Sequence, residues 1–328
     1  MTLAQTAKRA QPSQHNLKGH TAMTPSSPSS IPVVLTIAGS DSSGGAGVQA
    51  DIKTIAATGC YACSVMTAST AQNTQGVFDV LPLPVSHVMQ QLDAVFSDLN
   101  IVAVKIGMLA NAEIVEAVAN KLQAVRPRHL VIDPVLLSTS GRMLLSQDAL
   151  QPLQDRLLPM ADLVTPNLPE AAVLLGYPTG DTEDESIQRP TEMIADLQRL
   201  GLPAILLKGG HADDPHYSQD WLITASTTTM FSAPRIDESN THGTGCTLSS
   251  AIAAYLARGH SLSSAVEAAK TYISGAIRHA SQLDVGRGKG PLHHFYQQTV
   301  EQQTIGQSSL ISPSIKLTDV SDITQYKP

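Results

Sequence analysis

The chain has little of what marks membrane, secreted or nucleic-acid-binding proteins. Its 328 residues include only three cysteines, and no apolar run approaches the roughly 18 residues that a membrane-spanning helix needs. Charged residues make up 15% of the chain and the formal net charge is −7, which argues against a broad nucleic-acid surface. The polar start also lacks the apolar centre of a secretory signal. We therefore expect a cytoplasmic protein that binds small anionic ligands, with no nucleic-acid or membrane partner.

The few cysteines also limit redox and zinc chemistry. Cys60 and Cys63 form a CxxC pair without a second pair of ligands, and they enter a strand-like run, so we interpret both as structural. Cys246 differs because it lies in the segment 240–247, Asn-Thr-His-Gly-Thr-Gly-Cys-Thr, directly before a helical pattern. This segment is the most informative part of the sequence.

The apolar residues, 42% of the chain, are ample for a sizeable core and follow two alternating patterns. Short apolar runs predict strands at 33–38, 63–70, 101–106, 129–132, 163–165 and 204–207. Spacing at threes and fours predicts helices at 47–58, 86–97, 111–125, 168–175, 191–200, 248–258 and 261–282. This alternation predicts an α/β fold with a mainly parallel sheet covered on both faces. Residues 221–224 and 229–232 predict a short antiparallel pair at one edge.

Composition divides the chain into a folded part and two polar ends. Residues 1–30 are rich in Ser, Pro, Gln and Thr without periodicity, and residues 300–328 are similarly polar. We expect a disordered N-terminal tail, a single domain over 31–299 and a loosely attached C-terminal tail.

Glycine and polar residues follow the predicted strands, where ligands bind in sheets of this kind. They are Gly39-Ser40-Asp41, Gln72-Asn73, Gly107-Met108, Asp133-Pro134, Asn167 with Glu170, and Lys208 to His211. The glycine-rich stretch 39–47 does not fit the GxGxxG pattern of a dinucleotide site. Its small residues would instead allow a flat ligand to lie against the main chain. Gln72 and Asn73 can donate and accept hydrogen bonds to the edge of a heterocycle, although bonds to loop backbone would also explain them.

Gly243, Thr244, Gly245 and Cys246 are predicted to form an anion-binding turn at a helix N-terminus. Free amides and the positive end of the helix dipole meet there. The alternative is a glycine-rich turn capped by Thr244 or Thr247.

The position of Cys246 suggests a catalytic role for its thiol. The same amides and dipole would stabilise the thiolate, so that it could act as a general base. The competing interpretation, a nucleophilic cysteine hydrolase, is not favoured because His242 precedes the glycines outside any clear catalytic dyad.

Three charged residues at strand ends suit phosphoryl transfer. Lys208 offers a point charge for phosphates, and Asp133 and Glu170 could orient the waters of a Mg²⁺ ion. Lys208 could equally be a surface lysine, and Glu170 could form a capping box with Asn167. The capping and metal roles of Glu170 are compatible.

Taken together, these motifs resemble the hydroxymethylpyrimidine/phosphomethylpyrimidine kinases of the ribokinase superfamily, over nearly all of residues 31–295. The matching segments occur in the family's order at 36–51, 71–74, 105–109, 133–135, 165–171, 207–211 and 240–247. The resemblance implies a ribokinase-like three-layer α/β/α fold and a homodimer. It also implies ATP and Mg²⁺ as cofactors, and allows a monovalent cation. Many members carry a lysine in the loop where this chain has Thr139, so the lid contacts of this chain are expected to differ.

The resemblance also implies a role for individual residues. The implied pyrimidine-binding residues are Gly39, Asp51, Gln72, Met108 and Val135. The implied ATP-binding residues are Lys208, Thr241 and Lys270, with Asp133 and Glu170 serving Mg²⁺ through water. The implied catalytic residues are Gly243, Thr244, Gly245 and Cys246, where Cys246 replaces the aspartate that is usual in ribokinase relatives.

The implied activity is two successive ATP-dependent phosphorylations of one pyrimidine. The hydroxymethyl group of 4-amino-5-hydroxymethyl-2-methylpyrimidine would receive the first phosphoryl group, and the monophosphate would receive the second, giving a diphosphate for thiamine biosynthesis. Two alternatives stay open: a pyridoxal or pyridoxine kinase, and a non-catalytic sensor that binds the pyrimidine.

Overall fold

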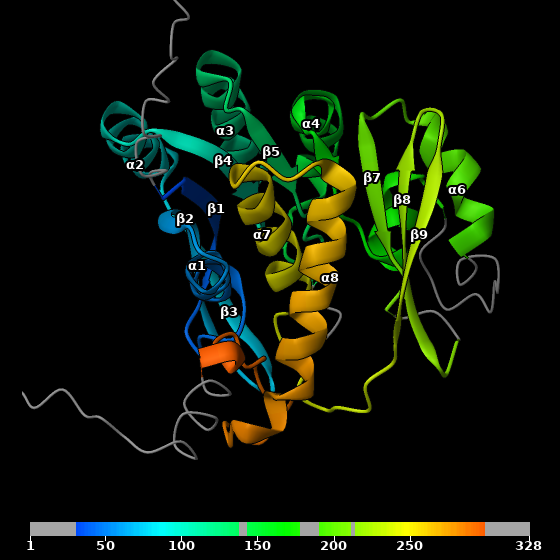
Figure 1. Cartoon of the computed structure of the whole chain (residues 1–328). Helices are drawn as coiled ribbons and strands as arrows, with labels where there is room; N and C mark the ends of the chain where they lie inside the picture. The colour runs from blue at the N-terminus through cyan, green and yellow to red at the C-terminus, as the bar shows by residue number, and fades with distance from the viewer. Residues whose placement is uncertain (1–30, 138–142, 178–189, 211–213, 299–328) are drawn as a thin grey trace, which may run out of the picture. The chain divides into compact units, whose positions relative to one another are not determined.

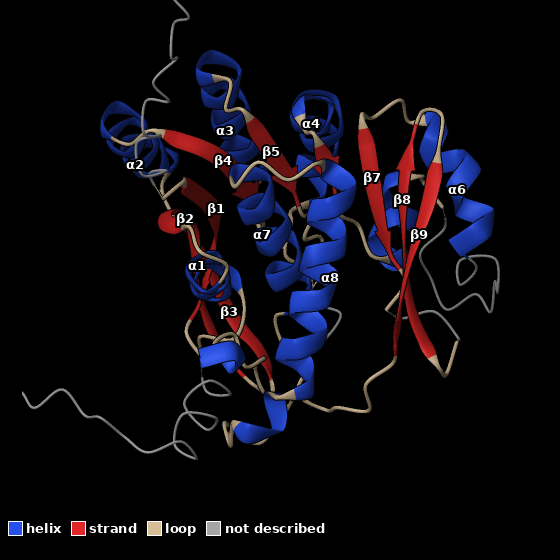
Figure 2. Ribbon diagram, viewed as in Figure 1, coloured by secondary structure: helices blue, strands red, loops and turns tan. Residues whose placement is uncertain are grey.

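A single nine-stranded sheet organises the protein, as the computed structural model shows (Figures 1 and 2). The structure describes residues 31–137, 143–177, 190–210 and 214–298. The predicted tails and Thr139 lie outside the described residues. The strand order is β3-β2-β1-β4-β5-β6-β7-β8-β9. The strands are β1 (Val33–Asp41), β2 (Tyr61–Asn73), β3 (Gly76–Pro82), β4 (Ile101–Ile106), β5 (His129–Ile132), β6 (Leu163–Val164), β7 (Ala204–Lys208), β8 (Tyr217–Thr224) and β9 (Thr228–Pro234).

The centre of the sheet is parallel and both of its edges are antiparallel. Strands β2, β1, β4, β5, β6 and β7 pair in parallel, while β3 pairs antiparallel with β2, and β8 and β9 extend the other edge. Because the central strands are parallel, their carboxyl ends meet at one edge of the molecule, where ligands bind in sheets of this kind.

Helices cover both faces of the sheet, as expected for buried parallel strands. The helices are α1 (Gly47–Ala57), α2 (Val85–Asp98), α3 (Ala112–Val125), α4 (Leu150–Pro152), α5 (Leu168–Leu174), α6 (Pro190–Arg199), α7 (Thr244–Ala257) and α8 (Leu262–Arg278). Strand alternation separates the two cores. In β1, Val34 packs in the cluster that contains residues of α1, α7 and α8, whereas Leu35 and Ile37 pack with residues of α2 and α3. Helices α5 and α6 pack against β7 and β8 through a third cluster.

The predicted fold is confirmed, with three local differences. The antiparallel pair β8–β9 is longer than expected and is not the only antiparallel edge, because β3 pairs with β2. Strand β3 was not predicted because as an edge strand its side chains are mostly exposed and do not alternate in burial. Helix α7 begins at Thr244 rather than at Leu248, so Cys246 lies in its first turn. None of the described helices is long and apolar enough to cross a membrane.

Candidate active site

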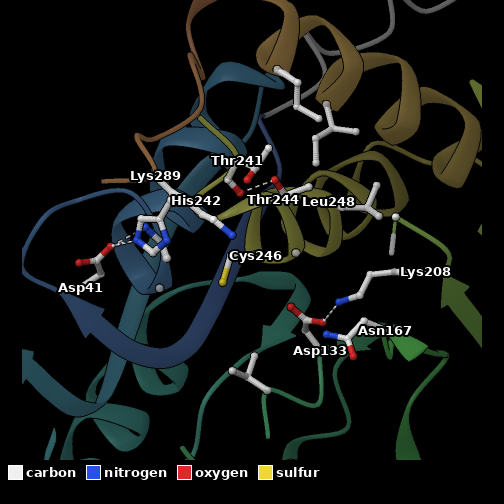
Figure 3. Close-up of a pocket in the computed structure, with 18 of the residues that line it drawn as sticks. Asp41, Asp133, Asn167, Lys208, Thr241, His242, Thr244, Cys246, Leu248 and Lys289 are labelled. Atoms are coloured by element: carbon white, nitrogen blue, oxygen red, sulfur yellow. Dashed lines mark hydrogen bonds and ion pairs between the residues drawn. The ribbon is translucent and has the colours of Figure 1, made fainter. Parts of the chain in front are cut away.

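A cavity of about 420 Å³ lies at the carboxyl ends of the central strands. This volume suits a small-molecule site. Its lining includes nearly all of the predicted site residues: Gly39, Gln72, Met108, Asp133, Val135, Glu170, Lys208, Thr241, Gly243, Thr244, Gly245, Cys246 and Lys270. Figure 3 shows Asp133 and Lys208 on one side of Cys246, with His242 and Asp41 on the other. The cavity therefore has two chemically different ends that meet at the start of α7.

The start of α7 requires glycine because the chain passes close to the turn that follows β1. Gly243 is the N-cap residue, with φ of 84°, and a β-carbon there would lie 1.9 Å from the carbonyl oxygen of Gly45. No side chain caps the helix, so capping by Thr244 or Thr247 is not observed. The hydroxyl of Thr244 instead donates to the carbonyl of Thr241 at 2.6 Å. The Thr244 amide donates to the Thr241 carbonyl at 3.3 Å, whereas the amides of Gly245 and Cys246 precede the intrahelical hydrogen bonds and are available to an anion.

Lys208 forms an ion-pair cluster with two buried carboxylates. Its Nζ lies 2.7 Å from Asp133 Oδ1 and 3.8 Å from Glu170 Oε2. Glu170 is held by the predicted capping box: its carboxylate accepts from the Asn167 amide, and its own amide donates to Asn167 Oδ1, both at 2.8 Å. A β-carbon on Gly245 would lie 3.3 Å from Lys208 Nζ, so the α7 turn directly adjoins this cluster.

Burial and charge act against each other in this cluster. Burial acts to raise the pKa of Asp133, but the Lys208 and Lys105 ammonium groups hold that pKa below its ordinary value. Burial raises the pKa of Glu170 to about 7, against the opposing charge of Lys208 and with a further contribution from Asp133. Burial acts to lower the pKa of Lys208, but the two carboxylates hold it above its ordinary value. The cluster thus keeps a cationic lysine at this end of the cavity.

The thiol of Cys246 does not have the low pKa that its position at a helix N-terminus predicts. Burial raises its pKa to about 11, because the Lys105 cation offsets only part of the desolvation and the Asp51 and Asp133 carboxylates add to it. Desolvation thus outweighs the expected stabilisation of the thiolate. The sequence showed the helix dipole but not the depth of burial.

Lys270 and Thr241, the other predicted ATP-binding residues, also line the cavity. Lys270 Nζ pairs with Asp220 Oδ2 at 2.6 Å, and Asp220 Oδ1 accepts from the Gly209 amide at 3.0 Å. This pair joins α8 to β8 and to the end of β7. Lys270 is thereby held in position on the cavity wall.

One wall of the other end of the cavity is apolar. A β-carbon on Gly39 would lie 2.4 Å from Met108 Cε, so glycine is required for the methionine to occupy its position. Met108 is 7% exposed, and Val135 packs beside it. The Met108 thioether, the Val135 side chain and the main chain at Gly39 line a space that suits a flat ring.

Gln72, His242 and Asp41 form a polar chain at this end. His242 Nε2 lies 2.8 Å from Asp41 Oδ2 and 3.3 Å from Gln72 Nε2, and Gln72 Oε1 accepts from the Thr70 hydroxyl at 3.1 Å. Burial acts to raise the pKa of Asp41, but hydrogen bonds from His242 and Ser43 lower it to about 2. An ionised carboxylate can only accept, so His242 Nε2 is the donor in its hydrogen bond to Asp41, and the 3.3 Å approach of Gln72 Nε2 to the same nitrogen brings two donors together. The Gln72 amide group can then donate to a ligand.

The structure corrects the predicted substrate contact of Asp51, which does not line the cavity. It is fully buried beneath it, and its carboxylate is paired with Lys105 Nζ at 2.8 Å. The same carboxylate accepts from the hydroxyls of Thr36 at 2.6 Å and Ser250 at 2.7 Å. With these partners it joins α1, β1, β4 and α7 and has a structural role.

Several cavity residues were not predicted. Asp220 and Lys289 line the cavity, and His242 takes part in the Gln72 chain although it was considered only as a partner for a nucleophilic cysteine. Asp220 directly precedes a predicted strand, and residues 286–290 read Gly-Arg-Gly-Lys-Gly. These were the signals available in the sequence.

The carboxylates of Asp133 and Glu170 fit a Mg²⁺ ion only if the ion is held through water, as the sequence suggested. Within the described ranges, no three His, Cys, Asp or Glu residues are grouped so that they could hold a metal ion. Asp133 and Glu170 nevertheless supply two carboxylates at the cavity wall, separated by Lys208. Mg²⁺ commonly binds one or two carboxylates while keeping several waters and contacting substrate phosphates. The donor chemistry fits such an ion.

The fold and this site together define a ribokinase-like α/β enzyme that transfers phosphoryl groups to a small molecule. A lysine and paired carboxylates occupy one end of the cavity, a helix N-terminus lies at its middle, and the other end has room for a small-molecule acceptor. Comparison with known proteins specifies the family.

The family profile of phosphomethylpyrimidine kinase matches residues 41–293. A hydroxymethylpyrimidine/phosphomethylpyrimidine kinase of Salmonella typhimurium is 51% identical over 262 residues, covering 80% of this chain and 97% of that protein. The chain belongs to the phosphomethylpyrimidine kinase family. The solved phosphomethylpyrimidine kinase of Clostridium difficile is 41% identical with a TM-score of 0.63, covering 75% of this chain and 99% of that one. The Bacillus subtilis pyridoxal kinase, solved as an ADP complex, is 32% identical with a TM-score of 0.71. The match covers 82% of this chain and 100% of that one.

Proposed function

We propose that this protein phosphorylates 4-amino-5-hydroxymethyl-2-methylpyrimidine with ATP, and then phosphorylates the monophosphate to the diphosphate used in thiamine biosynthesis. The observation that supports this most is the two-ended cavity. Met108 and Val135 pack together, and Gln72 lies next to His242, at the end proposed for the acceptor; Lys208 is at the end proposed for the phosphates, and the start of α7 joins the two ends. Relatives at about half identity carry the same activities in their names.

In the first reaction, Cys246 would accept the proton of the substrate hydroxymethyl group. The hydroxymethyl oxygen forms a bond to the γ-phosphorus, the bond from that phosphorus to the β–γ bridging oxygen breaks, and ADP leaves with the electron pair. The amides of the α7 turn stabilise negative charge on the transferred group. A thiol with a pKa of about 11 is rarely ionised at neutral pH, but its thiolate is a strong base.

The nucleotide would bind at the Lys208 end. Lys208 binds its phosphates, and Thr241 and Lys270 form the adjacent wall. Asp133 and Glu170 would hold Mg²⁺ through water, and the ion would neutralise phosphate charge when bound. A monovalent cation remains an additional prediction. It is tested by measuring ADP release after removal of potassium and sodium.

Product analysis by mass tests the proposal directly. Purified full-length protein is incubated with ATP, Mg²⁺ and the hydroxymethylpyrimidine, and the pyrimidine products are resolved by the number of phosphates they carry. We expect the monophosphate first and the diphosphate later. An exclusive monophosphate product would limit the function to the first reaction. Absence of both ADP and phosphorylated pyrimidine would instead favour a non-catalytic sensor.

A pyridoxal kinase is the second candidate, because solved pyridoxal kinases superimpose well on this chain. Their TM-scores reach 0.72, but their identity is 31–32%, against 51% for the pyrimidine kinase of Salmonella typhimurium. Comparing kcat/KM for the hydroxymethylpyrimidine and for pyridoxal separates the two. A clear preference for pyridoxal would overturn the first choice. Assembly as a homodimer and a cytoplasmic location remain predictions.

A further inference from the structure

The segment 286–290, Gly-Arg-Gly-Lys-Gly, is packed so closely that only glycine fits at three of its positions. A β-carbon on Gly286 would lie 2.3 Å from Thr74 Oγ1, and one on Gly288 would lie 2.1 Å from the Thr74 carbonyl oxygen. A β-carbon on Gly290 would lie 2.4 Å from Asn240 Oδ1. The basic residues of this segment are therefore carried on a main chain held against two other loops.

Hydrogen bonds fix the same main chain beside the start of α7. The Thr74 hydroxyl accepts from the amides of Arg287 at 3.2 Å and Gly288 at 3.1 Å. Asn240 Oδ1 accepts from the Gly290 amide at 3.0 Å, and the Gly290 carbonyl accepts from the His242 amide at 3.0 Å. Since His242 directly precedes the anion-binding turn, the segment and the turn are held in one arrangement.

From this segment the side chain of Lys289 reaches into the cavity. It lines the cavity wall, and Figure 3 shows it beside His242 with its ammonium group on the side of Cys246. Lys208 approaches Cys246 from the opposite side. Lys208 is paired with carboxylates, whereas Lys289 has no ion-pair partner among the residues that the structure describes. Its charge is available to a ligand at the acceptor end.

The two acceptors of the proposed function differ in charge and in whether they must lose a proton. The first is a neutral hydroxyl, which must lose a proton. The second is a phosphate monoester, whose last proton dissociates near pH 6, so its attacking oxygen is already ionised at neutral pH. It needs no base, but it brings about two negative charges close to the phosphates of the donor. A cation at the acceptor end would offset that repulsion.

We propose that Lys289 binds the phosphate of the pyrimidine monophosphate and so determines the efficiency of the second phosphorylation. This inference rests on the proposed function. In that reaction a monophosphate oxygen forms the new bond to the γ-phosphorus, and the electron pair of the broken bond leaves with ADP, as in the first. Lys289 would contact the acceptor phosphate, which the first acceptor lacks, so the second reaction should depend on its charge more than the first.

The two reactions are measured separately, with the hydroxymethylpyrimidine or its monophosphate supplied as the starting substrate. Lys289→Ala is expected to lower kcat/KM for the monophosphate by about 10- to 100-fold, mainly through KM, which corresponds to one charge-assisted hydrogen bond. The first reaction, whose acceptor is a neutral hydroxyl, should lose at least about tenfold less in kcat/KM than the second. Lys289→Arg should restore most of the second reaction. Titration calorimetry should show the same loss of monophosphate affinity in the absence of ATP.

Arg287→Ala is the matched control, because Arg287 carries the same charge on the same segment but is not in the cavity lining. It should leave both reactions close to wild type, and thermal unfolding should show that all variants fold. Equal losses in both reactions for Lys289→Ala, or no loss in either, would overturn the inference. If the wild-type protein forms no diphosphate, the proposed function fails at that step, independently of any variant.

Discussion

If the Cys246 thiolate is the general base, the first phosphorylation should accelerate steeply with pH. The thiol pKa is about 11, so about one thiol in 10⁴ is ionised near pH 7 and about one in 10² near pH 9. The active form is the deprotonated one, and its fraction rises tenfold per pH unit below the pKa. The rate of phosphoryl transfer to the hydroxymethyl group should therefore increase by about 100-fold over this range.

Single-turnover kinetics isolates the chemical step from product release. Enzyme in excess over the hydroxymethylpyrimidine is mixed with ATP and Mg²⁺, the reaction is stopped with acid, and the monophosphate is quantified. The same measurement with the monophosphate as substrate is an internal control. Its attacking oxygen is already ionised above about pH 6, so the second reaction should show no comparable slope.

The Cys246→Ala variant distinguishes a base from a pocket wall. Removing a base should lower the first-reaction rate far more than pyrimidine affinity, and it should abolish the pH slope. A flat wild-type profile, or a slope that persists in the variant, would refute the assignment of the thiol as the base. Equal losses of rate and affinity would show that the thiol mainly shapes the pocket.

Three further substitutions test other parts of the site. Gly243→Ala places a β-carbon 1.9 Å from the Gly45 carbonyl at a φ of 84°. It should cost at least about 1–3 kcal/mol of stability in urea unfolding, and wild-type stability would contradict the close approach. Lys208→Met should lower kcat/KM for ATP by about 100-fold or more in an ADP-release assay, and an unchanged value would exclude a phosphate contact. Asp51→Asn leaves Lys105 buried without its carboxylate and should cost about 3–5 kcal/mol. If the variant lost pyrimidine affinity while its stability was unchanged, Asp51 would contact the substrate and the structural role would be wrong.

The strand-end positions of the site could be predicted because they follow from topology. Parallel strands bring Asp133 and Lys208 to one edge of the sheet whatever the details of packing, and the structure places the two side chains 2.7 Å apart. The sequence could not show how deeply each side chain is buried. Asp51 lies within a family motif, but only the packing of α1 against α7 shows that its carboxylate points into the core rather than into the cavity.

The pKa of Cys246 and the position of Lys289 were missed for two reasons. Burial depends on how distant elements pack, and the chain after α8 folds back to the cavity. The helix dipole at Cys246 is visible in the sequence, but the desolvation that raises its pKa depends on the surrounding elements. Lys289 lies 43 residues after Cys246 in the sequence, and it reaches the cavity only because the segment after α8 returns to Thr74 and Asn240. No periodic pattern reports such a contact.

One site can phosphorylate both a hydroxyl and a phosphate because the groups that would discriminate between the acceptors differ from those that serve the donor. The α7 amides and Lys208, which adjoin each other at Gly245, would face the transferred phosphoryl group in either reaction. Cys246 would matter when the acceptor must lose a proton, and Lys289 would matter when the acceptor is already charged. Both side chains adjoin the same helix start in Figure 3, so the acceptor phosphate can take the place of the hydroxyl without a second binding site.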